Sequence, residues 1–206
     1  MGSTLAQLRA SLRQELRDED TAAYTWPDTI LDRHLQRAIA ETQAAAPTIV
    51  SIIATMPNPA SPRLNLSSLI SESAHLWFDA IEYPLDCYPR QWLPFREEPS
   101  RVMFLLAEEV PASGEDIRVW YARPFTVSAG SSDMPTEYDP MVLDGAAVFA
   151  LTDQAVDLAP KLVGRDAPAL YEALAEARAA RFSAALAALR LRSATPMWRP
   201  SWRLPR

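Results

Sequence analysis

The sequence predicts a mixed α+β fold that is mainly α-helical, with its strands inserted between two helical halves. Leucine and alanine recur every three or four residues near both ends of the chain, which is the spacing of one helix face. The middle is rich in β-branched residues and alternates apolar with polar side chains, as strands do. A length of 206 residues with 49% hydrophobic content suits one domain with a sizeable core.

An N-terminal αα-hairpin is predicted from helices at about residues 4–18 and 27–46. Thr4 and Gln7 have capping-box spacing. The first helix then carries a leucine stripe (Leu5, Leu8, Leu12, Leu16), and its arginines are expected on the other face (Arg9, Arg13, Arg17). The acidic run at 18–20 is expected to end this helix in a solvated loop. Pro27 suits the start of the second helix, whose buried stripe is predicted as Leu31, Leu35, Ala38, Ile39 and Thr42.

Residues 48–127 predict an antiparallel β-meander forming one small sheet. The run 48–56 is β-branched and apolar, and a proline-rich turn separates it from a short strand at 63–66. Further strands are expected at 76–83, 101–106 and 117–122. In the last of these, Ile117, Val119 and Tyr121 alternate with polar or amphipathic side chains, as in a half-buried strand. Ser113-Gly114-Glu115 is the predicted turn before it.

Two C-terminal helices are predicted at about 137–159 and 167–192, so that residues 1–192 form one domain. The first helix is apolar almost all round. Such a helix is buried either by the rest of its own chain or by another subunit. In the second case the interface residues would be Met141, Val142, Val148 and Phe149. The second helix is rich in alanine, and its apolar faces are expected from Leu170, Leu174, Ala177, Phe182, Ala185, Leu186 and Leu189.

No catalytic, metal or cofactor site is predicted. Five isolated glycines do not build a phosphate-binding loop. His34 and His75 are expected to be solvated surface residues outside any cluster with metal-ligand spacing. Cys87 is the single cysteine and has no predicted base beside it. We therefore expect a protein that is not an enzyme. The sequence shows neither a secretory signal nor the run of about 18 apolar residues typical of a membrane helix.

The net charge of −6 argues against a protein that coats DNA. Two acidic pairs, Glu97-Glu98 and Glu108-Glu109, lie near the ends of predicted strands. They are either solvated turn residues or, as a hypothesis, acids that face a DNA channel and repel the duplex.

Residues 193–206 predict an extended tail, because Pro196, Pro200 and Pro205 prevent a helix. Tryptophan and arginine dominate binding hot spots, so this tail is a candidate docking segment through Trp198, Arg199, Trp202, Arg203 and Arg206. The alternatives are stacking on single-stranded nucleic acid and a terminus without a partner.

Four segments of the chain resemble the head–tail adaptor (connector) proteins of tailed bacteriophages. They are the N-terminal hairpin with Tyr24-Thr-Trp-Pro-Asp, the strand segment Ile81-Glu-Tyr-Pro84, the strand Ile117-Arg-Val-Trp-Tyr-Ala-Arg-Pro-Phe125, and the run Met134-Pro-Thr-Glu-Tyr-Asp-Pro that enters an alanine-rich helix. The resemblance covers residues 4–192, and none of its motifs is a catalytic fingerprint.

The resemblance implies a structural virion protein that forms a homo-oligomeric ring of twelve subunits. Such a ring joins the portal to the tail in the virion neck and continues the channel through which double-stranded DNA is packaged. Its partners would be further copies, the portal and the next neck or tail protein, with no membrane and no sequence-specific DNA contact. The chain would be made in the bacterial cytoplasm, and its C-terminal tail would reach the portal. Two alternatives stay open: another neck or tail-tube ring protein, such as a head-closure stopper or tail terminator, and a non-viral protein-binding module.

Overall fold

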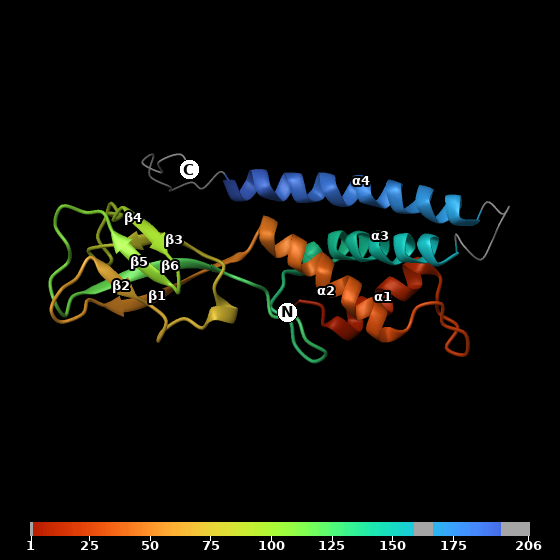
Figure 1. Ribbon diagram of the computed structural model, residues 1–206, viewed down its shortest axis with the longest axis horizontal. Coiled ribbons are helices and arrows are strands. Elements are labelled where there is room, and N and C mark those ends of the chain that lie inside the picture. Colours follow the sequence, from red (N-terminus) through yellow and green to blue (C-terminus); the bar gives the residue numbers. More distant parts are fainter. Residues whose placement is uncertain (1, 159–166, 195–206) are drawn as a thin grey trace. The chain divides into compact units, whose positions relative to one another are not determined.

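The computed structural model describes residues 2–158 and 167–194, and it has the mixed α+β composition that the sequence predicts. The chain divides into two compact units. The helical unit contains residues 2–46 together with the described residues from 125 onward, and the β unit contains residues 47–124 (Figure 1). The strands are thus inserted between two helical segments of sequence, and the predicted fold class is confirmed.

Four helices build the helical unit: α1 (Leu5–Leu16), α2 (Asp28–Ala45), α3 (Asp139–Leu158) and α4 (Ala167–Ala194). A 3-10 turn, η2 (Thr136–Tyr138), leads into α3. The predicted capping box is present, since the Thr4 side chain accepts from the Gln7 N–H while the Gln7 side chain accepts from the Thr4 N–H. The first helix ends in a left-handed cap at Arg17 (φ 54°).

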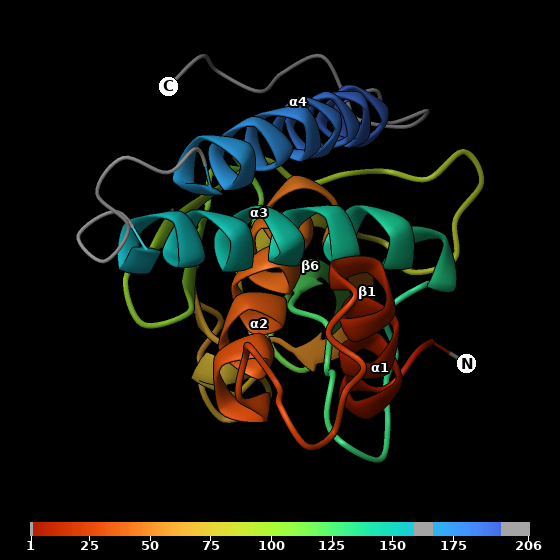
Figure 2. The ribbon, with the colours of Figure 1, turned by 90° about the vertical axis from the view of Figure 1, so that its right-hand side faces the viewer.

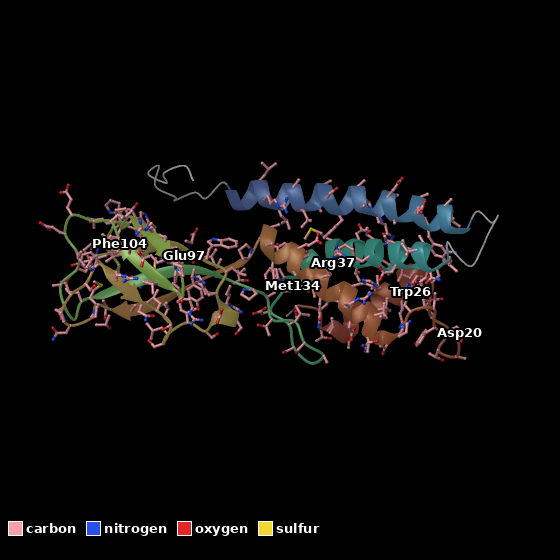
Figure 3. All side chains as sticks on the ribbon, in the orientation of Figure 1. Asp20, Trp26, Arg37, Glu97, Phe104 and Met134 are labelled. Atoms are coloured by element: carbon pink, nitrogen blue, oxygen red, sulfur yellow. The ribbon has the colours of Figure 1, made fainter. Side chains whose placement is uncertain are left out.

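The helix α3 lies at the centre of this unit and packs against α1, α2 and α4 (Figure 2). Val142, Ala146 and Ala147 in α3 have no exposed surface. Around them the core is completed by leucines of the hairpin, by Trp26 and by Met134 from the loop before α3 (Figure 3). The other helices of the same chain therefore cover the nearly all-apolar α3, which was one of the two possibilities left open by the sequence.

Close helix packing around α3 depends on Gly145. A Cβ at this position would lie 2.8 Å from the Phe182 ring of α4 and 3.1 Å from the Ala38 Cβ of α2. A larger residue here would force the Phe182 ring and Ala38 to move away, so Gly145 favours the close approach of α2, α3 and α4. Phe182 also meets Phe149 edge to face, with ring centroids 6.5 Å apart, and this contact joins α3 to α4.

The β unit contains two three-stranded antiparallel sheets. The first has the order β1 (Thr48–Thr55), β6 (Asp116–Arg123), β3 (Trp77–Glu82). The second has the order β2 (Arg63–Asn65), β5 (Val102–Leu105), β4 (Phe95–Glu98). A short 3-10 helix, η1 (Glu72–Ala74), precedes β3. The inward residues of both sheets meet in one core, with Ile117 and Val119 of β6 and Met103 of β5 fully buried.

The prediction of one β-meander is wrong in its topology. Strand β6 lies between β1 and β3 although both precede it in the sequence, and two sheets form in place of one. The pairing of β1 with β6 joins residues such as Ile52 and Val119 that are far apart along the chain, and local sequence pattern does not encode such partners. Strand β4 was also missed, because its short run ends in charged residues at 96–98. The predicted turn is present, with Gly114 in the left-handed region (φ 83°).

Candidate functional site

The predicted channel acids lie in the β unit, and the structure separates them into two kinds. Glu97 and Glu98 belong to β4, whereas Glu108 and Glu109 lie in the segment between β5 and β6 and are exposed. The Glu98 carboxylate accepts from Arg63 at 2.7 Å and from Arg96 at 3.1 Å. These two guanidinium groups, Arg96 first, hold its pKa below the usual value. Glu98 is therefore a neutralised acid, while Glu108 and Glu109 present their charge to solvent.

Glu97 has an internal role that its sequence neighbourhood did not indicate. One of its carboxylate oxygens accepts from the Phe78 N–H at 3.3 Å, and so connects β4 to β3. The other oxygen lies 3.7 Å from Nε2 of His75. Glu97 thus contributes to holding the two sheets together.

His34 is buried and His75 is half-buried, with 9% of its side chain exposed, so the expectation of solvated surface residues is wrong. His34 is 3% exposed, and its Nε2 lies 3.3 Å from Asp153 of α3. Its position was readable from spacing, because His34 comes three residues after Leu31 and four before Ala38, on the buried stripe of α2. The His75 ring packs 4.3 Å from Phe78. Burial lowers the pKa of both imidazoles.

A buried ionic network in the helical unit was also unexpected. Arg13, predicted on the polar face of α1, is 7% exposed, and Asp18, predicted in a solvated loop, is 5% exposed. Arg13 donates to the Asp18 carboxylate, to the Trp26 carbonyl at 2.8 Å and to Asp28 at 2.7 Å. Asp18 in turn accepts from the N–H groups of Thr25 and Trp26. The segment between the helices folds back over Arg13, which buries both charges.

The β unit has a comparable network around Glu82, which is fully buried. Arg118 of β6 donates to Glu82 at 3.0 Å and to Asp86 at 2.9 Å. Arg90 approaches the same carboxylate at 3.7 Å and lies over the Trp120 ring. Nearby, the Tyr83 hydroxyl donates to Glu115, which raises the pKa of Tyr83 and lowers that of Glu115. The charged and hydroxyl groups of this cluster are paired with one another, which indicates that the cluster stabilises the fold.

The candidate interface residues of α3 turn out to be covered by their own chain to different degrees. Met141 is 8% exposed and Val142 is not exposed at all, so these two have almost no surface for a neighbouring subunit. Phe149 is half-buried beneath Arg37 of α2, whose guanidinium carbon lies 3.9 Å from the ring centroid. Val148 is half-buried as well. The tail residues Trp198, Arg199, Trp202, Arg203 and Arg206 lie outside the described residues.

Three large apolar side chains are exposed along α4. Of the residues predicted to form the apolar faces of this helix, Leu186 and Leu189 pack inward with Phe182. Leu170, Leu174 and Leu191 point the other way and are 62%, 47% and 71% exposed. Exposed alanines fill the intervals between them. Exposed apolar side chains that gather on one helix face are a common feature of protein–protein contact sites. In the β unit, Ile49 and Ile53 of β1 are 37% and 51% exposed, and Leu69, Leu76, Tyr88 and Leu106 are exposed as well.

Within residues 2–158 and 167–194, no three or more His, Cys, Asp or Glu side chains come together in a way that could hold a metal ion. In the same ranges, no helix has the length and apolar character needed to cross a membrane. Cys87 is half-buried and not in a disulfide.

No protein-family profile matches the chain, and no curated protein matches it. Among solved structures, the chain is similar to one in the neck of an empty GTA (gene transfer agent) particle computed with C6 symmetry. The two are 16% identical and superpose with a TM-score of 0.31, over 68% of this chain and 76% of the other. At that TM-score the two chains share too little geometry to assign a family.

Proposed function

We propose that the chain is a non-catalytic structural subunit of a phage-like neck, which assembles with copies of itself into a ring between portal and tail. The observation that best supports this proposal is the order of elements. The sequence pattern predicts a helical hairpin, a β insertion and two further helices, a layout that resembles head–tail adaptors, and the fold has that order with the helices together in one unit.

The exposed face of α4 supports the same proposal from surface chemistry. A subunit that works by assembly needs apolar surface that the isolated chain leaves uncovered, and Leu170, Leu174 and Leu191 provide it. The candidate contact surface therefore moves from α3, which its own chain covers, to α4.

A ring around moving DNA should not hold the duplex, because Lys and Arg contacts to phosphates release counterions and bind it. The chain carries a net charge of −6. Of the four acids first considered, Glu108 and Glu109 suit a channel surface best, since they are exposed and belong to no strand. Glu98 suits it least, because Arg63 and Arg96 already neutralise it.

The C-terminal tail completes the proposal as the segment that contacts the portal. Trp198 and Trp202 would fill apolar pockets while Arg199, Arg203 and Arg206 meet acids around them. The prolines at 196, 200 and 205 restrict the tail and lower the entropy lost on docking.

Negative-stain electron microscopy of the full chain, alone and mixed with its portal protein, tests this function. Rings, or rings capping the portal, are the expected result. A chain truncated after Ser193 should still form rings but lose portal binding. Rings that form but do not bind the portal would favour a head-closure stopper or a tail terminator. A chain that forms no ring under either condition would contradict the proposal and favour a non-viral binding module.

A further inference from the structure

The outward face of α4 carries a regular apolar seam. We define the α4 seam as the exposed residues that recur alternately three and four positions apart: Leu170, Ala173, Ala177, Ala180, Ala184, Ala187 and Leu191. This is the spacing of the a and d positions of a coiled coil. The seam runs along most of a helix that spans Ala167–Ala194, and no charged residue interrupts it.

The residues beside the seam are patterned along its length. One edge carries Glu176 in the first half of the helix and Arg190 in the second, with Ser183 midway between them. All three are exposed. The other edge carries Leu174, Arg181 and Ala188. A helix that is acidic early and basic late along one edge is complementary to a copy of itself running in the opposite direction.

We propose that α4 docks against α4 of a second copy of this chain, antiparallel, seam to seam. In this register Glu176 of each copy lies opposite Arg190 of the partner subunit, so two ion pairs form, and Ser183 meets Ser183 of the partner subunit at the centre. Leu191 lies opposite the partner's Ala173, so that a large side chain meets a small one near each end. Leu174 lies opposite the partner's Ala188 in the same way. Leu174 and Leu191 therefore each pack on an alanine of the partner subunit.

Alanine along the seam allows the two helix axes to approach closely, at the short end of the usual 8–10 Å range. The resulting contact is isologous, because the same surface is used by both copies. It buries Leu174 and Leu191, which are 47% and 71% exposed in the single chain.

Arg181, like Ser183, meets its own copy across the axis in this register. Its charge is already engaged, because it donates to Asp144 of α3 at 2.7 Å. A parallel pair would place Glu176 opposite Arg181 of the partner subunit. It would also stack leucine on leucine at both ends of the seam and alanine on alanine between them. The antiparallel arrangement therefore fits the seam better.

This inference goes beyond ring formation, since an antiparallel pair is a closed dimer of the unassembled chain. Pairing would cover the apolar face of α4 while the chain is in solution. Contacts formed during assembly would then have to displace the partner subunit from this face. The dimer does not depend on the neck proposal, and each can fail without the other.

Sedimentation velocity of the full chain over about 1 to 200 μM is the first test. A concentration-dependent monomer–dimer equilibrium is expected. Ala180→Glu places a charge in the centre of the seam and should weaken dimerisation by about a hundredfold. Ala10→Glu, the same change at an exposed alanine of α1, should leave it unchanged. A wild-type chain that remains monomeric throughout, or an Ala180→Glu variant that still dimerises, would overturn the inference.

A charge exchange tests the direction. Glu176→Arg and Arg190→Glu should each weaken the dimer by roughly two- to tenfold, because like charges then face each other twice. The double variant should recover wild-type affinity. Combining Arg181→Glu with Glu176→Arg should not restore the affinity of the dimer. Rescue of Glu176→Arg by Arg181→Glu in place of Arg190→Glu would indicate a parallel pair and contradict the register. Circular dichroism of each variant confirms that α4 still forms.

Discussion

The helical unit and the β unit place their apolar residues differently. In the β unit two sheets face each other, the largest apolar side chains lie between them, and ion pairs such as Arg63–Glu98 occupy the surface. In the helical unit α3 is covered by its neighbours, while α4 leaves a long apolar face exposed. The buried cores of the two units therefore do not contain all the large apolar side chains of this chain, because some stay exposed. Three of the large apolar side chains that stay exposed lie along α4, namely Leu170, Leu174 and Leu191. There we expect the protein contacts.

The two units also share a feature, an acid buried against an arginine. In the helical unit, the side chains of Arg13 and Asp18 are 8% and 4% exposed. In the β unit, those of Arg118 and Glu82 are 18% and 0% exposed. Breaking a buried pair leaves one charge without compensation. The pair with the more deeply buried arginine should therefore be the more sensitive one, which ranks the experiments below.

The largest effect is expected from Arg13→Met. Asp18 would remain buried without its main partner, and the free energy of unfolding of the helical unit should fall by about 3–5 kcal/mol. Urea denaturation followed by helical circular dichroism measures this. Adding Asp18→Asn should restore part of the loss, and Arg9→Met, at a more exposed pair, should cost less than about 1 kcal/mol. A loss below about 1 kcal/mol for Arg13→Met would show that the network is not important for stability.

A smaller effect is expected from Glu82→Gln in the β unit. Arg118 keeps Asp86 as a partner at 2.9 Å, so the loss should be about 1–3 kcal/mol. Urea denaturation followed by tryptophan fluorescence of the β unit is the measurement. Glu98→Gln, at an exposed pair, is the matched control and should change stability by less than about 1 kcal/mol. If Glu82→Gln proved more damaging than Arg13→Met, the ranking of the two units would be reversed.

The third prediction concerns pH and should affect both units alike. Burial holds the pKa of His34 and His75 below the ordinary value of 6.5. The unfolded chain therefore binds protons that the folded chain does not, once the pH falls through about 6.5. Stability should decline as the pH is lowered from 7.5 and level off below the folded pKa values.

Denaturation curves between about pH 7.5 and 5.5 test this pH dependence. His34→Gln should flatten the profile of the helical unit and leave that of the β unit unchanged, and His75→Gln should do the reverse. The lowered pKa values of Asp28 and Glu98 act in a lower window, below their ordinary values near 4. Profiles that stay parallel to the wild-type profile in both variants would contradict the assignment.

The smallest effect on stability is expected from Glu108→Gln combined with Glu109→Gln, within about 0.5 kcal/mol. Because the fold should be unaffected, a change in DNA packaging or retention by particles carrying this variant would report on the channel alone. We expect DNA passage to be impaired. Glu97→Gln with Glu98→Gln is the comparison, and should affect packaging less because Glu98 is neutralised. Unchanged packaging in both double variants would show that these acids do not line the channel.

Local pattern predicted much of the helical unit and less of the β unit. The capping box at Thr4 and the stripe through Leu31 and Leu35 are short-range signals, and both were confirmed. The order of the strands depends on which distant segments pair, and spacing does not contain that information. Strand β4 escaped detection because its charged residues find partners on other strands.

The same difference between short-range pattern and long-range contact applies to the exposure of individual residues. The exposure of Glu108 and Glu109 follows from the loop between two strands, which the sequence does indicate. The burial of Arg13 depends on Asp18 and Trp26 closing over it, a contact that helix periodicity does not reveal. The α4 seam was visible as a three-four spacing of alanine and leucine, but its exposure needed the structure, since alanine suits core and surface equally.

Hydrogen–deuterium exchange of the full chain, dilute and then assembled with the portal, tests the central claim most directly. The account predicts a gain in protection over residues 167–191, with little change over 95–123 of the β unit. Protection that appears in the β unit while α4 exchanges as in the dilute chain would contradict it.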